Sequence, residues 1–500
     1  MMQLRTQVVV LVVVGILMIA GSLTFQFFFD RLFDSMLEKK LMILPGSKTL
    51  ENFKSPPVPI FMQFWLFNVT NSEDVLQGSI PKLQQVGPYT YEEKQLKYNL
   101  SFNHDEGTVT YLQNKTFFYR QDLSPGVDLS DKVTTVNAVM MSLGAKLSLK
   151  SETFLAVAEV WFQRFGVTPF ITRSVRELLF DGYDEPLLLQ LADLTNDPEH
   201  ATGRFGFYRK NNTNGGAYTV YTGEKGMDNY QHIARWRGEE MIDFWHPDLY
   251  GGNTCNMING TAGNQFPRPI ERHGKVDLYV AELCRSISVE YQKDVQHGAL
   301  TLYRHVLPDR MLARTPDTDC FCVDKFTCRA SMINVAPCRK GAPVVMSTPH
   351  FYQGAQEDIE QLGLHPVATE HETFLDIEPN TGVTFRAAKR IQANIPLKRY
   401  GDMPSFRDIP ELVLPVFWVN ESAVVPVERT HALHRTLNLP FMLVTVGVAV
   451  LVTLGVVLIL VALVKVVLAR RGGAKKPKNR RPGKDKEKSV TEKLNSRNYS

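Results

Sequence analysis

The sequence lacks every short motif that would indicate a common catalytic site. It contains no Gly-x-Ser-x-Gly, no phosphate-binding Gly-x-x-x-x-Gly-Lys and no His-Glu-x-x-His. His371-Glu372 is not followed by the second histidine of a zinc helix. His350, His365 and His371 could be imagined as metal ligands, but scattered polar loop histidines are the interpretation we prefer. The sequence therefore predicts no enzyme, no cofactor and no metal site.

Charge is absent between Leu439 and Val464. About 20 such residues cross the hydrocarbon core as a helix, so we predict a transmembrane helix over residues 439–468. The tail that follows, Arg470 to Ser500, holds twelve Lys/Arg against three Asp/Glu, a net charge of +9. Basic residues just outside a span mark the cytoplasmic side. Residues 469–500 are therefore predicted to lie in the cytosol.

A second uncharged run extends from Val8 to Phe29. It is either a retained span or a cleaved signal peptide, and the small residues 20–22 fit cleavage. Cleavage would leave a mature terminus starting near Phe-Gln-Phe-Phe-Phe, so we favour a retained span over residues 8–29. Residues 1–7 are then cytosolic, and 30–438 form an ectodomain. Helical spacing predicts a stalk helix from Arg31 to Leu44.

The ectodomain is mildly acidic. Of the net charge of +4, the tail contributes +9 and Lys465 and Arg5 one each, which leaves −7 for residues 30–438. This argues against nucleic acid as a partner, because a folded nucleic-acid binder carries a basic patch. The tail could be misread as a nucleic-acid arm. We interpret it as a juxtamembrane tail that is solvated or contacts anionic inner-leaflet lipids.

Cysteine is absent outside residues 255–338. The six cysteines are Cys255, Cys284, Cys320, Cys322, Cys328 and Cys338. An even number within one part of a non-cytosolic domain indicates disulfides. A zinc site formed by the last four is the competing interpretation, and free thiolates are rare in an oxidising lumen.

Potential glycosylation sites agree with this topology. Asn-x-Ser/Thr occurs in the ectodomain at Asn68, Asn99, Asn114, Asn211, Asn259 and Asn420. Six such sequons on the predicted exterior side indicate N-glycosylation in the secretory pathway.

The residue pattern of 59–120 is typical of antiparallel strands, with turns expected at Gly87-Pro88, 103–107 and Asn114-Lys115. From Thr134 to Phe180 the period changes to that of about three helices. Residues 203–223 read as a hairpin in which 204–208 pair with 218–222 around Asn214-Gly215.

The second of these helices is apolar almost all round. Its main stripe is Phe154, Val157, Ala158, Trp161 and Phe165, and Leu155, Val160 and Phe162 lie off it. Such a helix is either buried on both sides or exposes a hydrophobic patch. Burial is the default interpretation.

Several segments resemble the class B scavenger receptor family. They are Cys255 to Thr261, Cys284 to Ile287, Cys320-Phe321-Cys322, Gly87-Pro88-Tyr89, Arg176 to Leu179, Pro349-His350-Phe351, Leu375 to Pro379 and Trp418 to Glu421. Because these segments are spread along most of the chain, the resemblance covers it from one span to the other.

The resemblance implies a β-dominated fold, a large antiparallel β-barrel ectodomain with a hydrophobic tunnel and an apical helical bundle. It places the bundle at 134–180 and the cysteine-rich part at 255–338. It also implies disulfides joining Cys255 to Cys320, Cys284 to Cys338 and Cys322 to Cys328. The sequence alone leaves open which of the possible pairings forms. Palmitoylated cysteines beside the spans, present in some members, are absent here.

The function that the resemblance implies is a scavenger receptor at the plasma membrane that binds lipids or lipoproteins and passes lipid to the membrane. Candidate ligand-binding residues are Trp161, Phe162 and Phe165 for acyl chains and Arg164 for an anionic headgroup. Ordinary packing within the bundle is the alternative for these four. Oligomerisation is possible.

Two other functions remain open. One is a lysosomal or endosomal receptor that sorts a hydrolase and exports lipid. Residues 105–199 contain no histidine for a pH-dependent release, and the tail shows no dileucine or tyrosine sorting signal. The other is a two-span ligand-gated channel, which the few polar residues in the spans disfavour.

Overall fold

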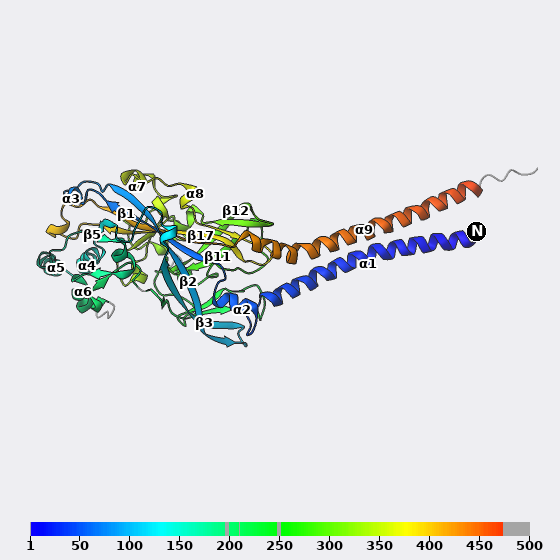
Figure 1. Cartoon of the computed structure of the whole chain (residues 1–500), viewed down its shortest axis with the longest axis horizontal. Coiled ribbons are helices and arrows are strands. Elements are labelled where there is room, and N and C mark those ends of the chain that lie inside the picture. Colours follow the sequence, from blue (N-terminus) through cyan, green and yellow to red (C-terminus); the bar gives the residue numbers. More distant parts are fainter. Residues whose placement is uncertain (1, 196–199, 210, 248–251, 474–500) are drawn as a thin grey trace, which may run out of the picture. The chain divides into compact units, whose positions relative to one another are not determined.

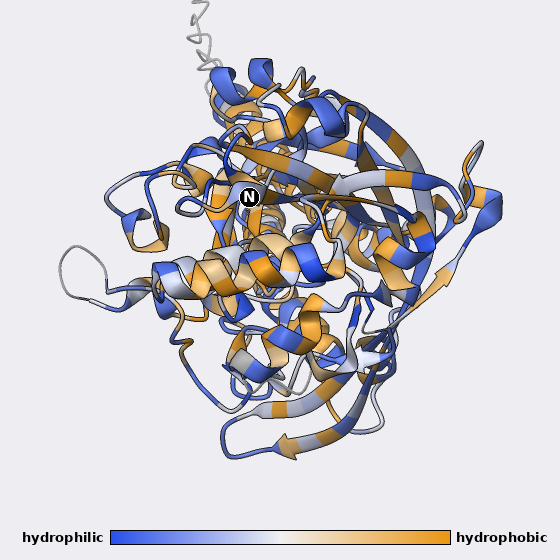
Figure 2. Ribbon diagram, turned by 90° about the vertical axis from the view of Figure 1, so that its left-hand side faces the viewer, coloured by the Kyte–Doolittle hydropathy of each residue, from blue (hydrophilic) through white to orange (hydrophobic). Residues whose placement is uncertain are grey.

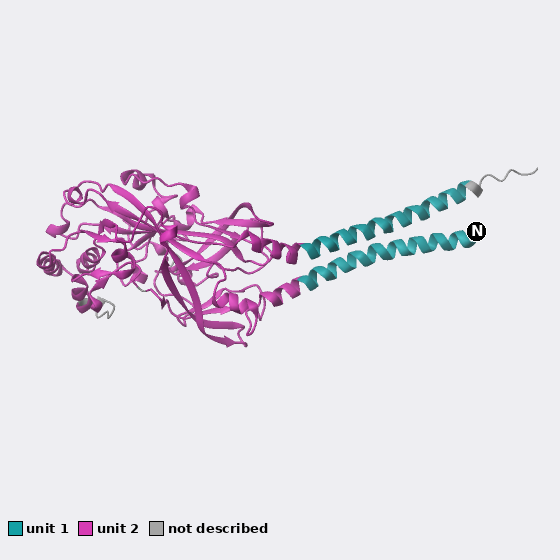
Figure 3. Cartoon of the chain, in the orientation of Figure 1, with its two compact units in different colours: residues 1–33, 439–500 teal, residues 34–438 magenta. Residues whose placement is uncertain are grey.

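A computed structural model describes residues 2–195, 200–209, 211–247 and 252–473. The chain divides into two units (Figure 3): unit 1 comprises residues 1–33 and 439–500, and unit 2 comprises residues 34–438. The predicted basic tail lies outside the described residues from position 474 onward.

Unit 1 contains most of the long helices α1 (Met2–Leu41) and α9 (Val427–Gly473), whose remaining residues belong to unit 2. Both are long and apolar enough to cross a membrane, as predicted for the two spans. The two helices pack closely within this unit, because a Cβ added to Gly15 would lie 2.7 Å from the carbonyl oxygen of Gly455, and the reverse contact is equally short. Small residues of this kind let membrane helices approach each other. Helix α1 also continues through most of the stalk predicted to end at Leu44.

Unit 2 is built around one antiparallel sheet of 14 strands in the described residues (Figure 1). Its main path runs β10-β9-β3-β2-β1-β18-β17-β16-β13-β12-β11. Their bounds are β1 (Ile60–Val69), β2 (Leu83–Asn103), β3 (Thr108–Tyr119), β9 (Tyr218–Tyr221), β10 (Ile233–Trp236), β11 (Lys275–Val280), β12 (Arg285–His297), β13 (Leu300–Val306), β16 (Phe374–Ile377), β17 (Thr384–Leu397) and β18 (Leu412–Val424). The short strands β8 (Thr213–Asn214), β14 (Met332–Asn334) and β15 (Val345–Ser347) branch from this path.

The sheet curls until its two ends meet. Ile233 of β10 donates to the carbonyl of Gly260 at 2.9 Å, and Tyr279 of β11 donates to the carbonyl of Thr261 at 2.9 Å. The rings of Trp236 and Tyr279 lie 5.6 Å apart. The segment 260–261 therefore closes the seam, and the β-dominated barrel that was predicted is confirmed.

Helices gather at the end of unit 2 opposite to its Asp34 and Asn438 ends. They are α4 (Ala138–Ser148), α5 (Glu152–Phe165), a π-helical turn (Glu177–Asp181) and α6 (Leu187–Thr195), with the strand pairs β4 (Lys132–Val136) with β5 (Phe170–Ser174) and β6 (Tyr183–Asp184) with β7 (Arg204–Phe205). Figure 2 looks onto this end and shows hydrophobic and hydrophilic residues alternating along the helices. The bundle thus extends beyond the predicted boundary at Phe180.

The remaining helices are short and cover the barrel. They are α2 (Lys48–Lys54), α3 (Ser72–Val75), α7 (Gln356–Gln361) and α8 (Ala368–His371). Ser47 caps α2, because its side chain accepts a hydrogen bond from the backbone N–H of Leu50 at 3.0 Å.

Two turn predictions and the hairpin prediction are wrong. Gly87-Pro88 lies inside β2 at a register shift against β1, and Asn114-Lys115 lies inside β3. Residues 204–205 pair with β6, whereas β9 pairs with β3 and β10. In each case long-range pairing overrides a local turn signal. The turn expected at 103–107 is confirmed between β2 and β3.

Candidate functional site

The predicted ligand-binding residues lie on α5, but they do not share one face. Leu155, Ala158 and Phe162 form its buried side. Phe162 is 1% exposed and its ring meets that of Phe406 edge-on at 5.8 Å. The prediction for Phe162 therefore needs correction, since a ring enclosed in the bundle cannot line a capture surface. The buried face combines Leu155 and Phe162, which lay off the predicted stripe, with Ala158, which lay on it.

The opposite side of α5 leaves apolar side chains in solvent. Phe154, Val157 and Val160 are exposed, and Val160 is 61% exposed. Trp161 and Phe165 are half-buried against the core, and Arg164 is exposed with its guanidinium 5.9 Å from the ring centre of Phe165. We call Phe154, Val157, Val160, Trp161, Arg164 and Phe165 the α5 surface. It combines a cation with exposed apolar area.

A second candidate site lies inside the barrel. Side chains alternate along β2, so that Tyr91, Glu93, Gln95 and Lys97 face the interior while their neighbours face outward. Glu93 and Lys97 are buried, at 3% and 2% exposure. Buried charges require partners.

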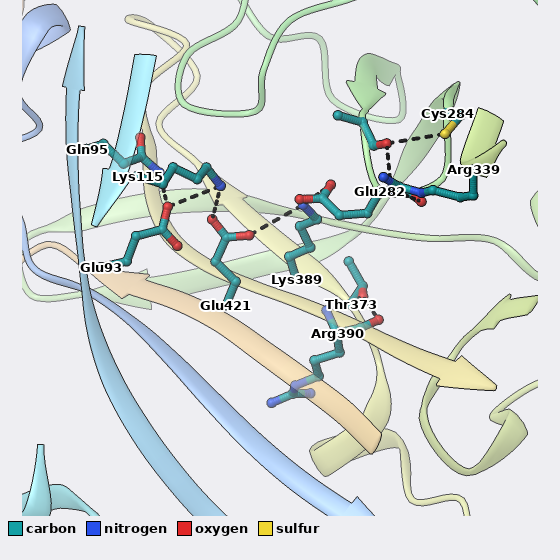
Figure 4. Close-up of polar contacts among 11 residues, drawn as sticks. Glu93, Gln95, Lys115, Glu282, Cys284, Arg339, Thr373, Lys389, Arg390 and Glu421 are labelled. Carbon is teal, nitrogen blue, oxygen red and sulfur yellow. Dashed lines mark hydrogen bonds and ion pairs between the residues drawn. The ribbon is translucent and has the colours of Figure 1, made fainter. Parts of the chain in front are cut away.

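The first partner lies on the neighbouring strand β3, and the others lie farther along the sheet. Lys115 Nζ on β3 lies 3.1 Å from Glu93 Oε1 and 3.5 Å from Glu421 Oε1 on β18. Lys389 Nζ on β17 lies 3.4 Å from Glu421 Oε2 and 2.7 Å from Glu282 Oε2, in the turn between β11 and β12. Figure 4 shows this alternating row. We call Glu93, Lys115, Glu421, Lys389 and Glu282 the charge ladder.

The charge ladder crosses the concave face of the sheet. Strands β3 and β18 are separated by β2 and β1, which amounts to about 14 Å along a flat sheet. A contact of 3.5 Å between Lys115 and Glu421 requires the sheet to curl so that the side chains meet across its interior. Glu282 and Lys389 continue the row to the opposite wall.

Burial and pairing compete in the charge ladder. Burial raises the pKa of Glu93, whose second oxygen has no hydrogen-bond partner in the described part of the chain. Burial also disfavours ionised Glu282 and Glu421, but Lys389 and Lys115 outweigh it and hold the pKa of both carboxyls below the usual range. Ion pairing therefore keeps Glu282 and Glu421 of the charge ladder charged.

Burial disfavours the charged form of every member of the charge ladder, yet four of the five side chains remain partly exposed. Exposed fractions are 35% for Lys115, 34% for Glu282, 26% for Lys389 and 18% for Glu421, against 0% for Glu93. These four side chains therefore keep part of their surface free of protein contacts inside the barrel.

Aromatic rings lie on both sides of the charge ladder. On one side are Phe64, Tyr91, Phe117, Phe180, Tyr208 and Phe417, whose ring centres lie 4.5–6.4 Å from one another in successive pairs. On the other side Lys97 Nζ lies over Phe53 at 4.5 Å and donates to its carbonyl at 2.9 Å. Burial and then Lys115 lower the pKa of Lys97 to about 8. The interior is thus aromatic at both ends and charged between them.

The sequence interpretation missed this site. Asn114-Lys115 was predicted to be a turn rather than part of a strand. The signal that could have found it is the run Glu93, Gln95 and Lys97 in register with buried Tyr91, because three polar residues on the core face of a strand indicate a polar interior.

The cysteines form three disulfides, Cys255–Cys320, Cys284–Cys338 and Cys322–Cys328, the pairs that the resemblance implied. Among the sequons, Asn99, Asn211 and Asn259 are exposed. Asn68, Asn114 and Asn420 are half-buried and hydrogen-bond to Thr134, Asn212 and Gln63 respectively. Glycosylation of all six stays a prediction.

The three histidines are not scattered, which corrects that prediction. The rings of His350 and His371 stack at 4.4 Å, and the backbone N–H of His365 donates to His350 Nδ1 at 3.2 Å. Both ring nitrogens of His350 contact protein groups, since Nε2 also lies 2.7 Å from Gln85 Oε1, and His371 Nδ1 accepts from the backbone N–H of Val367 at 2.8 Å. Among the described residues, no group of three His, Cys, Asp or Glu is arranged to hold a metal ion.

Comparisons with known proteins agree with the motifs. The profile of the CD36 family matches residues 12–466. Lysosome membrane protein 2 of Mus musculus is 34% identical over 432 residues, which cover 84% of this chain and 88% of that protein. Scavenger receptor class B member 1 of Bos taurus is 31% identical over 432 residues, covering 85% and 82%. The chain therefore belongs to the CD36 family, the class B scavenger receptor family that its motifs indicated.

Proposed function

We propose that this receptor binds lipids or lipoproteins at the α5 surface and passes lipid through the barrel of unit 2 to the membrane. The observation that supports it best is that four side chains of the charge ladder remain partly exposed inside the barrel, with aromatic rings on both sides of the row. A lipid in water exposes its chains at about 0.8 kcal/mol for each CH₂. An enclosed route lowers this barrier without any chemical change.

Capture is expected to depend on the exposed side of α5. Trp161→Ala removes apolar area, and Arg164→Glu replaces the cation that would pair with an anionic headgroup, so each variant should bind lipoprotein several-fold more weakly. Lys94→Glu, an exposed charge reversal on the outer face of β2, is the matched control. Binding is measured on cells with equal surface expression. Unchanged binding by both α5 variants would remove this surface from the proposal.

Passage is expected to depend on free space inside the barrel. Ala393 of β17 lies opposite Phe417 and on the same face as Lys389, so Ala393→Trp places a large ring in the interior. We expect lipoprotein binding to persist and lipid transfer from bound lipoprotein to fall by about tenfold or more. Leu96→Trp, at an outward position of β2 that is 52% exposed, should leave both unchanged. Full transfer by a folded Ala393→Trp protein would contradict a route through the barrel.

A lysosomal sorting receptor that also exports lipid is the second candidate, because proteins named lysosome membrane protein 2 are among the relatives. The two candidates differ in location. Surface biotinylation of the full-length protein supports the first, whereas co-fractionation with lysosomes and no surface pool supports the second.

A further inference from the structure

The positive charges of the ladder are already neutralised. Each ammonium group lies between two carboxylates: Lys115 between Glu93 and Glu421, Lys389 between Glu421 and Glu282. Three glutamates face two lysines, a formal net charge of −1. A proton on Glu93, which burial favours, brings this to zero. In neither state does the ladder hold a surplus cation for a bound anion.

The next interior cation does not change this balance. Lys97 is four residues from Glu93 along β2, about 14 Å away. Its ammonium group is turned to the Phe53 carbonyl and ring. With 2% exposure it is closed to a molecule beside the charge ladder.

A lipid that moves through the interior of the barrel has to pass the ladder side chains that are partly exposed. The row reaches from β2 and β3 to the turn after β11, and its accessible members are Lys115, Glu421, Lys389 and Glu282. An anionic head beside them meets at least one carboxylate for each ammonium. A head without net charge meets no such repulsion.

We infer that the charge ladder acts as a charge filter, which passes lipids whose head carries no net charge and slows lipids whose head is an anion. This inference rests on the proposed function and adds a selectivity to it. Glu421 and Glu282 are then specificity-determining residues, and Lys389 opposes them.

The test uses the full-length protein in proteoliposomes. Two fluorescent phospholipids with identical acyl chains are compared, phosphatidylcholine with no net charge and phosphatidylglycerol with one negative charge. Protein-dependent transfer should favour phosphatidylcholine by about tenfold. Glu282→Gln and Glu421→Gln should each reduce this ratio severalfold, and Lys389→Gln should increase it.

The control is Glu92→Gln, since Glu92 is the outward neighbour of Glu93 and pairs with Arg120 at 2.8 Å. It should leave the ratio unchanged. Glu282 lies at the accessible end of the ladder, so Glu282→Gln provides the test if Glu421→Gln fails to fold. If phosphatidylcholine is transferred but no ladder variant alters the ratio of phosphatidylcholine to phosphatidylglycerol transfer, the filter alone is overturned. Absence of protein-dependent transfer of both lipids overturns the proposed function and the filter together.

Discussion

Replacing Asp376 by Ala is expected to destabilise unit 2 by about 3–5 kcal/mol. The Asp376 side chain is 0% exposed and receives two parallel hydrogen bonds from Arg304, with Nε at 2.7 Å and Nη2 at 2.8 Å. Arg386 Nη1 lies 3.5 Å from the same carboxylate. The substitution leaves two guanidinium groups without their shared anion. Thermal unfolding of the full-length protein in detergent measures the loss.

The matched control is Asp294→Ala, which removes a carboxylate that pairs with Arg272 at 2.7 Å but lies at the surface. Surface ion pairs contribute little, so its melting temperature should stay near that of the unmodified protein. Equal melting temperatures for the two variants would show that the Asp376 pairs contribute no more than surface ion pairs.

Acidification is expected to weaken unit 2 through His350 and His371. Burial, and then the neighbouring His371 and His365, lower the pKa of His350 to about 3. Burial lowers the pKa of His371 to about 4. The unfolded chain takes up a proton on each near pH 6.5, whereas the folded chain stays neutral. Stability is therefore full above about pH 6.5 and declines toward pH 4, by roughly 2 kcal/mol between about pH 7 and 5.5 for the pair.

The double variant His350→Gln with His371→Asn tests this assignment. Gln can keep the contact to Gln85, and Asn can still accept from the backbone N–H of Val367, which donates to His371 Nδ1 at 2.8 Å. The fall in melting temperature between neutral and acidic pH should be smaller in this variant. His246→Asn, at an exposed position, should keep the slope of the unmodified protein. Parallel slopes in all three proteins would locate the acid sensitivity elsewhere.

The same histidines bear on location. A protein that works in an acidic compartment would lose stability there through His350 and His371, while one at the cell surface would not. This favours neither candidate by itself, because relatives of both kinds are found. It does predict that the lysosomal candidate needs compensating interactions.

What could be read from the sequence was the part that depends on long, uniform signals. The spans need only length and absence of charge, and the family motifs are specific strings of residues. The prediction of which α5 residues are exposed was wrong for Phe162, because a helix that is apolar all round does not show in its sequence which side will be buried. Phe154 and Phe162 look equivalent in the sequence, and only the contact with Phe406 distinguishes them. The buried side of α5 is decided by tertiary packing.

The interior site failed for a different reason. Lys115 is a turn residue by local propensity, yet it lies inside β3 opposite Gln95 of β2, and its ammonium group contacts Glu421 of β18, over 300 positions later in the chain. Local sequence holds no information on such a partner. The motif Leu375 to Pro379 shows the converse: Asp376 holds Arg304, and Glu378 accepts from the backbone N–H of Thr381 at 2.8 Å. Both acids are explained by structure alone.

Pairing of β1 with β18 also governs how the molecule is made. Ile60 lies opposite Ala423, so the first strand to emerge during synthesis waits for nearly the last one. Ribosomes add roughly 5–20 residues each second, and for tens of seconds the edge of β1 that will receive β18 has no partner. Such an edge is prone to wrong pairing. That edge stays unpaired until translation has passed Val424, so β1 completes its pairing only after nearly all of unit 2 has been synthesised.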